Sequence, residues 1–279
     1  MTEQQQKFQV KIVYLLPILA SLIFGLGCAY LLKPQITQVI PVTPFPEDTA
    51  SGPFGNAFYF VILIGVSATV FYFLLKRKNV KIIKGLIALA MTTASLLLSL
   101  VYLSAIFAYV TVPYVDILII ALSIAITVLF DLAIFRFPKT RNVAVIGLGG
   151  ALGVFFGYSI PLYSAVLILA FLAVYDVFAV YRGPVGKIAQ SGLDQLSGLS
   201  FSFKDIQMGL GDLVFYSMLT GAMFFSFPNS ILPVAMSVVG ILAGSIVTFF
   251  MLEKKGIFPG LPFPIMLGLA LGLATGFLL

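Results

Sequence analysis

Long apolar runs alternate with short polar segments along almost the whole chain. A helix needs about twenty consecutive apolar residues to cross the hydrocarbon core of a bilayer. By this criterion the pattern predicts an all-α membrane protein with nine transmembrane helices. The predicted spans are Val13–Leu32, Ala57–Leu75, Gly85–Val110, Tyr114–Phe135, Val143–Gly157, Pro161–Tyr181, Ile206–Phe227, Ile231–Leu252 and Phe263–Leu279.

The basic residues are distributed unevenly between the two sides of this arrangement. The N-terminus and every second connection together hold 15 of the 16 lysine and arginine residues, and Lys33 alone lies on the other side. Basic loops face the cytoplasm by the positive-inside rule. We therefore expect a cytoplasmic N-terminus and an extracytoplasmic C-terminus, an orientation that also requires an odd number of spans.

The spans form a single polytopic membrane domain over residues 1–279. Residues 1–181 hold predicted spans one to six, residues 182–205 form a long cytoplasmic loop, and residues 206–279 hold spans seven to nine. The first span lacks a clear small-residue cleavage site, so we interpret it as a retained helix and not as a signal peptide. The lipid bilayer is thus the predicted environment of the chain.

Composition narrows the classes of function. The chain is 61% hydrophobic and 9% charged, whereas soluble domains are about a quarter charged, which excludes a water-soluble fold. The net charge of +6 comes from short basic clusters between spans and does not indicate nucleic-acid binding. There is no histidine and one cysteine, Cys28, so no intramolecular disulfide forms. Histidine-dependent nucleophiles and histidine-based zinc sites are excluded, and we predict neither a metal nor a cofactor.

Two of the ten acidic residues lie deep inside predicted spans. A central aspartate costs a membrane helix about 2.5–3.5 kcal/mol, so such residues usually face the protein interior and have a function. Asp176 lies six residues before Arg182, and Asp212 lies eight residues after Lys204, in sequential antiparallel spans. Both are therefore expected about 10 Å below the same cytoplasmic face. The other eight lie in tails, in loops or near the ends of spans: Glu3, Glu47, Asp48, Asp116, Asp131, Asp194, Asp205 and Glu253.

A pair of carboxylates at the same depth supports two kinds of chemistry. Two such groups held close together cannot both ionise easily and therefore share one proton. The ionised partner then accepts a proton from water while the protonated partner hydrogen-bonds a peptide carbonyl, which is the chemistry of aspartic proteases. The same groups also suit a proton or cation transporter or a leak channel. We find no inverted repeat of the kind that transporters use, but the residues alone leave both alternatives open.

Two glycines and a proline-rich segment accompany these aspartates. In a helix, Gly209 would lie three residues before Asp212 and clear its face, and Gly211 would loosen the adjacent backbone, each at a cost of about 1 kcal/mol. Pro259-Gly260-Leu261-Pro262 prevents a regular helix at the start of the ninth span. Irregular backbone at membrane depth is tolerated where it lines protein or a water-filled cavity. Strand addition to a peptide and an ordinary interfacial turn are equally compatible with this segment.

Three predicted spans carry glycines four residues apart. Such glycines lie on one helical face and allow two helices to approach closely. We interpret them as packing surfaces: Gly149, Gly153 and Gly157; Gly240 and Gly244; Gly268, Gly272 and Gly276.

Taken together, these motifs resemble those of the presenilin and signal-peptide-peptidase family of intramembrane aspartyl proteases. Tyr175-Asp176 is similar to the family's Tyr-Asp motif, and Gly209-Leu210-Gly211-Asp212 matches its Gly-x-Gly-Asp motif. The following Leu213-Val214-Phe215-Tyr216-Ser217 is similar to presenilin itself. Pro259-Gly260-Leu261 stands where the family has Pro-Ala-Leu.

The resemblance implies a nine-span protease whose catalytic dyad is Asp176 and Asp212. It implies active-site support by four neighbouring residues, which are Tyr175, Gly209, Leu210 and Gly211. It also implies substrate binding by Pro259, Gly260 and Leu261.

Orientation discriminates within the family, because presenilins are expected to place the C-terminus outside and signal peptide peptidases in the cytosol. The orientation expected here is that of presenilins, and it implies substrates whose N-terminus lies outside the cell, as in type I single-span proteins. The compact chain resembles a microbial homologue that acts in the cell membrane without accessory subunits. A prepilin-peptidase-like protease, which also uses a Gly-x-Gly-Asp carboxylate, is a further alternative and would cut soluble leader segments.

Overall fold

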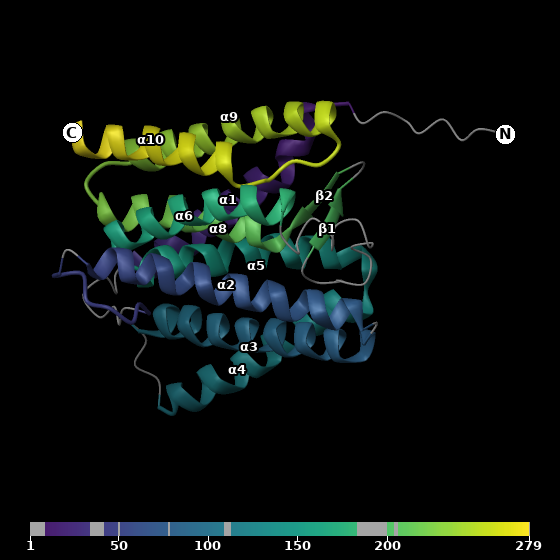
Figure 1. The fold of residues 1–279 in the computed structure, drawn as a ribbon. Helices are drawn as coiled ribbons and strands as arrows, with labels where there is room; N and C mark the ends of the chain where they lie inside the picture. The colour runs from purple at the N-terminus through teal and green to yellow at the C-terminus, as the bar shows by residue number, and fades with distance from the viewer. Residues whose placement is uncertain are drawn as a thin grey trace.

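The computed structural model describes residues 9–33, 42–49, 51–77, 79–108, 113–182, 200–203 and 206–278. Within these residues the chain forms nine α-helices and one two-stranded antiparallel sheet (Figure 1). The helices are α1 (Leu16–Leu32), α2 (Gly52–Lys76), α3 (Val80–Phe107), α4 (Val115–Asp131), α5 (Pro138–Ser159), α6 (Leu162–Tyr181), α8 (Leu210–Ser226), α9 (Leu232–Lys255) and α10 (Pro262–Leu278). A 3₁₀ turn (Ile12–Leu15) leads into α1, and a π-helical turn (Leu132–Arg136) extends α4.

The surface of this bundle is apolar. Among the described residues, seven helical segments are long and apolar enough to cross a membrane, and α8 and α10 are shorter apolar helices. Large apolar side chains are exposed on the outer helices, for example Ile62 at 61%, Val66 at 58% and Leu129 at 67%. An apolar surface of this extent indicates contact with lipid and not with water. The chain is therefore an integral membrane protein with an all-helical transmembrane part.

Eight of the nine predicted spans correspond to one helix each, with ends that differ by no more than five residues. Helices α2 and α5 each begin five residues earlier than hydropathy predicts. Both have a proline in the first turn, where its missing N–H costs no helical hydrogen bond. Helices therefore extend beyond the apolar run into the polar flanks.

The seventh predicted span, Ile206–Phe227, is wrong at its beginning. Its first four residues form strand β2 (Ile206–Gly209), which pairs with β1 (Ser200–Phe203), and α8 begins only at Leu210. Along β2 the buried and exposed side chains alternate, which is the period of a strand. Hydropathy averages over this alternation and so assigns the strand to the helix. Strand β1 also forms the described end of the predicted loop 182–205, most of which lies outside the described residues.

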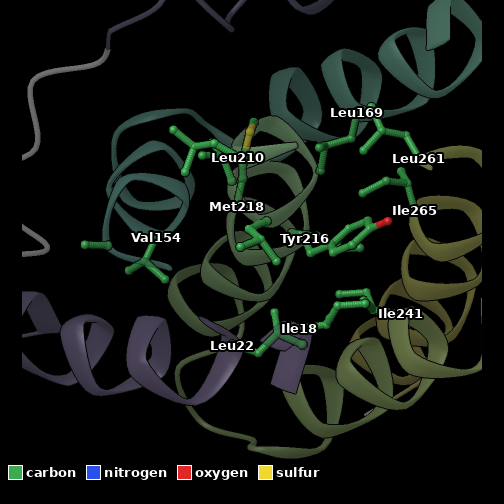
Figure 2. Close-up of a cluster of buried hydrophobic side chains, with 14 of the residues drawn as sticks. Ile18, Leu22, Val154, Leu169, Leu210, Tyr216, Met218, Ile241, Leu261 and Ile265 are labelled. Carbon is green, nitrogen blue, oxygen red and sulfur yellow. The ribbon is translucent and has the colours of Figure 1, made fainter. Parts of the chain in front are cut away.

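Helix α8 lies at the centre of the fold, in contact with α1, α5, α6, α9 and α10. Most of its side chains are buried, and those of Leu213 and Leu219 have no exposed surface. Figure 2 shows Tyr216 of α8 within this core, among residues of neighbouring helices such as Ile18 and Val154. In Figure 1, α9 and α10 form one edge of the bundle, and α3 and α4 lie at the opposite edge.

The predicted role of the spaced glycines in packing is confirmed. A β-carbon built on Gly153 of α5 would overlap the carbonyl oxygen of Val214 in α8. A β-carbon on Gly240 of α9 would lie 2.5 Å from the carbonyl oxygen of Leu267 in α10. Both pairs of helices therefore pack backbone against backbone, which supplies the van der Waals contact that holds membrane helices together.

The segment 42–49 fastens the beginnings of α2 and α6 to each other. Asn56 of α2 has no exposed surface and makes two hydrogen bonds of 3.0 Å with the backbone of Phe45. It also donates a hydrogen bond of 2.9 Å to Oγ of Ser164 in α6. The Glu47 carboxylate accepts a 2.8 Å hydrogen bond from the backbone N–H of Ser164, which satisfies a free amide in the first turn of α6. Helix α6 is thus anchored at the end far from Asp176.

Candidate active site

Asp176 projects from α6 five residues before that helix ends at Tyr181. Its side chain is partly exposed. Oδ2 accepts a hydrogen bond of 3.0 Å from the backbone N–H of Leu261, and the Gly260 N–H is a second backbone donor to the carboxyl group. Both donors belong to the connection between α9 and α10, so the surroundings of Asp176 are set by a segment 85 residues away.

Asp212 is the third residue of α8, directly after strand β2. Its carboxyl group accepts a hydrogen bond from the backbone N–H of Gly209, the N-cap residue. An acidic side chain that reaches back from the third helical position to the N-cap amide forms one half of a capping box. The helix dipole also favours negative charge in the first turn. Asp212 is therefore stabilised by the beginning of its own helix.

The predicted irregular segment Pro259-Gly260-Leu261 contacts both aspartates. A β-carbon built on Gly260 would lie 2.8 Å from Oδ2 of Asp212, so the backbone of Gly260 packs directly against that carboxyl group. The next residue, Leu261, donates its N–H to Asp176. Pro259 and Leu261 are buried. Gly260 thus contacts both carboxyl groups and Leu261 contacts that of Asp176, and the two carboxyl groups interact electrostatically with each other. This placement favours a lining role for the segment over an interfacial turn.

Tyr216 lies one helical turn after Asp212 and was not expected among the site residues. Its hydroxyl group donates a hydrogen bond of 2.8 Å to the carbonyl oxygen of Gly260, and its side chain is 2% exposed. Figure 2 shows the Tyr216 ring directed away from α8 toward Leu261 and Ile265. Two signals in the sequence point to it: Tyr216 lies within the presenilin-like stretch that follows Asp212, and the spacing of four residues places both side chains on one helical face.

The role expected for Gly209 is wrong in its geometry. Gly209 has φ −75° and ψ 146° and is the N-cap of α8, so it does not share a helical face with Asp212. A β-carbon at Gly209 would lie 4.0 Å from Oδ2 of Asp212, an ordinary contact. Gly211 lies inside α8 and is exposed, and a β-carbon there would meet Phe215 at 3.8 Å. The site therefore depends on the N–H of Gly209 and not on its missing side chain.

Tyr175 and Leu210 pack the aspartate-bearing helices against their neighbours. Tyr175 lines a groove of about 630 Å³ between α2 and α6, and a β-carbon at Gly65 of α2 would lie 3.5 Å from its hydroxyl group. Leu210 is 7% exposed, and its Cδ1 would lie 3.4 Å from a β-carbon on Gly149 of α5. Tyr175 therefore faces α2, whereas Leu210 seats the first turn of α8 on α5.

The remaining acidic side chains of the described segments lie apart from this site. Asp131 accepts a hydrogen bond of 2.7 Å from Oγ1 of Thr92, and Asp116 is exposed in the first turn of α4. Glu253 accepts a hydrogen bond of 3.3 Å from the N–H of Val10. Within the described part of the chain, no three His, Cys, Asp or Glu side chains gather where they could hold a metal ion.

The fold and the site define a helical membrane protein built around two interacting carboxyl groups. A family model described as signal-peptide peptidase, presenilin aspartyl protease matches residues 44–195, which is more than half of the chain. The chain belongs to this family of intramembrane aspartyl proteases and is an aspartic endopeptidase. The matched region contains Tyr175 and Asp176 and ends before Asp212.

Two solved structures have the same fold. One is a presenilin family intramembrane aspartate protease in space group C222, with 20% identity, a TM-score of 0.67, and coverage of 95% of this chain and 99% of that chain. The other, in space group P2, has 19% identity, a TM-score of 0.61, and coverage of 98% of this chain and 99% of that chain. Comparison with curated proteins gives no match. The likeness extends over the first spans, which carry none of the short motifs.

Proposed function

We propose that the protein hydrolyses peptide bonds within the transmembrane helices of single-span membrane proteins, with Asp176 and Asp212 as its catalytic dyad. The observation that carries this proposal is the pair of contacts from one backbone segment: Leu261 N–H on Asp176, and Gly260 against Asp212. The contact of both carboxyl groups with one segment, and their electrostatic interaction, support the sharing of a single proton between them. Both side chains are also partly exposed, which supports the entry of a water molecule.

In this mechanism the ionised carboxylate removes a proton from water while the protonated carboxyl group gives its proton to the carbonyl oxygen of the peptide bond. The water oxygen bonds to the carbonyl carbon, and a tetrahedral diol forms. The C–N bond then breaks, and a proton passes to the leaving amine. The products are a new carboxyl terminus and a new amino terminus. The pair returns to its singly protonated state, and the reaction needs neither a metal nor a cofactor.

The substrate helix must first unwind, because its peptide bonds are otherwise shielded and hydrogen-bonded. Strand β2 supports this step. It ends at Gly209, three residues before Asp212, and within the described residues it pairs with β1 on one edge only. A free strand edge binds an extended peptide through backbone hydrogen bonds. The unwound segment of a substrate would add to β2 and reach the dyad in extended form.

The neighbouring residues take supporting roles in this proposal. Pro259, Gly260 and Leu261, whose segment contacts the carboxyl groups, would bind the substrate. Four residues would support the dyad by holding its helices in place: Tyr175, Gly209, Leu210 and Gly211. The Gly209 N–H and the packing of Leu210 against α5 support this assignment.

For topology we propose nine spans in one polytopic domain, with a cytoplasmic N-terminus and an extracytoplasmic C-terminus. The distribution of basic residues supports this orientation. Substrates then have an outside N-terminus, like type I single-span proteins. We further propose that the protein acts in the cell membrane of a microbe without accessory subunits.

The test compares cleavage of a purified single-span substrate by the parent protein with cleavage by Asp176→Asn and Asp212→Asn. These substitutions preserve shape and remove the ionisable group, so each is expected to abolish cleavage while the thermal unfolding midpoint stays close to that of the parent. Asp131→Asn is the matched control, because Asp131 also lies in a membrane helix but bonds to Thr92. It is expected to cleave like the parent.

Cleavage that persists in either dyad variant would overturn the proposed dyad. The alternative of a proton or cation transporter or leak channel predicts a different result. In that case ion flux into vesicles would depend on both aspartates, while a peptide mimic of the tetrahedral intermediate would leave the flux unchanged. A preference for soluble leader peptides over membrane helices would instead favour a prepilin-peptidase-like activity.

A further inference from the structure

Tyr216 connects the central helix of the fold to the segment that contacts both carboxyl groups. It lies on α8 four residues after Asp212, and its side chain is 2% exposed. Its hydroxyl group donates a hydrogen bond of 2.8 Å to the carbonyl oxygen of Gly260, which is 44 residues away in sequence. Asp212 and Tyr216 therefore act on the same backbone unit from one face of one helix.

The backbone around Gly260 has few other ways to satisfy its polar groups. Pro259 and Pro262 have no N–H, and the segment precedes α10, so its own N–H groups donate no helical hydrogen bonds. The Leu261 N–H is used by Asp176, and the Leu261 carbonyl oxygen accepts from Ile265 at 3.0 Å. Among the described residues, the Gly260 carbonyl group has Tyr216 as its one hydrogen-bond donor. Loss of that donor would leave the partly buried Gly260 carbonyl group without a hydrogen bond from the protein.

A second helix packs against the Tyr216 hydroxyl group. The side chain of Ser245, on α9, lies beside the phenol oxygen. Ser245 is 2% exposed and donates its own proton to the Ile241 carbonyl oxygen at 2.8 Å, so the Tyr216 proton remains for the Gly260 carbonyl oxygen. The phenol group thus lies between α8, α9 and the segment that leads into α10.

We propose that Tyr216 is a positioning residue for peptide hydrolysis. Its hydrogen bond holds the Gly260 carbonyl group so that the Leu261 N–H stays on Asp176 and the Gly260 backbone stays against Asp212. This inference rests on the proposed dyad. Tyr216 itself touches neither substrate nor water in the proposed mechanism; it sets the distance and direction of groups that do. Small misplacements of reacting groups are sufficient to cost about a hundredfold in rate.

The test is Tyr216→Phe, which removes the hydroxyl group and keeps the buried ring. Its matched control is Tyr102→Phe, because the Tyr102 hydroxyl group also donates a 2.8 Å hydrogen bond to a backbone carbonyl oxygen, that of Ala151, far from the dyad. For Tyr216→Phe we expect kcat for a single-span substrate to fall about ten- to hundredfold while KM changes less than about threefold. For Tyr102→Phe we expect both constants to stay within about twofold of the parent. A replacement of Tyr216 by 4-aminophenylalanine restores an N–H donor at the same place and should recover most of the lost kcat.

Each outcome decides the inference. A parental kcat in Tyr216→Phe overturns it, as does an equal fall in kcat in Tyr102→Phe, since that would reflect a general loss of stability. A rise in KM at unchanged kcat would assign Tyr216 to substrate binding instead. Should Tyr216→Phe fail to fold, failure of the folded 4-aminophenylalanine variant to cleave would overturn the inference, and parental cleavage by it would support it. Asp176→Asn and Asp212→Asn are measured in parallel. If the proposed dyad is wrong, cleavage persists in these two variants; if only the role of Tyr216 is wrong, they are inactive and Tyr216→Phe is not impaired.

Discussion

The two proposed catalytic aspartates are held in opposite ways. Asp212 stands in the first turn of α8, where the helix dipole and the N–H of Gly209 favour a carboxylate. Asp176 stands more than one turn before the end of α6, where its own helix has no free backbone N–H to offer. It obtains its hydrogen bond from Leu261, on a different part of the chain. The surroundings of Asp212 are therefore formed by residues next to it in the sequence, whereas those of Asp176 depend on tertiary structure.

This difference explains why the irregular segment before α10 is central. The carboxyl group of Asp212 would keep its capping interaction if the segment moved, whereas that of Asp176 would lose its backbone donors. We therefore expect assembly of the proposed dyad to depend on the surroundings of Asp176, through Gly260 and Leu261. The local support of Asp212 and the tertiary support of Asp176 can be broken separately.

Gly209→Pro is expected to have the largest effect of the three substitutions that test this comparison. The backbone of Gly209 has φ −75°, which proline adopts without strain, but proline has no N–H to donate to Asp212. Loss of a hydrogen bond to a charged group costs about 1.5–3 kcal/mol, or roughly ten- to hundredfold in kcat/KM. Cleavage kinetics with a single-span substrate measure this loss. Gly209→Ala keeps the N–H and makes only ordinary contacts, so equal activity losses in the two variants would contradict local capping of Asp212.

Gly260→Ala is expected to lower kcat about tenfold, because a methyl group there would push the Asp212 carboxyl group aside. The added β-carbon would lie 2.8–3.1 Å from all three atoms of that group. The measurement is kcat together with the thermal unfolding midpoint, which should change little because a short side chain can move. Gly85→Ala, in an open position of α3, controls for the general effect of adding a methyl group to a glycine. An unchanged kcat in Gly260→Ala would show that Asp212 does not depend on this contact.

Glu47→Ala tests the anchoring of the helix that carries Asp176 and should have the smallest effect. It removes the 2.8 Å hydrogen bond to the Ser164 N–H in the first turn of α6. Loss of such a cap costs about 1 kcal/mol of stability, and kcat should stay within about twofold of the parent because the dyad lies at the other end of the helix. Chemical unfolding in detergent and initial cleavage rates measure the two quantities. A large fall in kcat would show that the distant end of α6 positions Asp176.

The sequence alone predicted most of the helices, because a membrane helix is defined by the length of its apolar run. The sequence also identified the helix-packing surfaces formed by glycines four residues apart, because that spacing is a local property of a helix. Strand β2 was missed for the opposite reason. Its alternation covers only four residues, Ile206–Gly209, and its partner β1 precedes it in a loop that carries no apolar run.

The site shows the same division between local and tertiary information. The two aspartates were singled out because an intramembrane charge is costly wherever it stands. Pro259-Gly260-Leu261 was assigned to the site through the family resemblance, since an irregular segment alone is equally compatible with an interfacial turn. The contacts that join them were beyond prediction from the sequence. The Leu261–Asp176 and Tyr216–Gly260 hydrogen bonds span 85 and 44 residues, and no local pattern encodes which carbonyl group a buried tyrosine will meet.

The central claim is that Asp176 and Asp212 act as one catalytic unit. Single-turnover cleavage of a single-span substrate by Asp176→Asn, Asp212→Asn and the double variant tests it most directly. Groups that act as a unit are strongly non-additive, so each single variant should lose as much rate as the double variant. Partial losses that multiply to give the rate of the double variant would show that the two aspartates act independently, and would contradict the account.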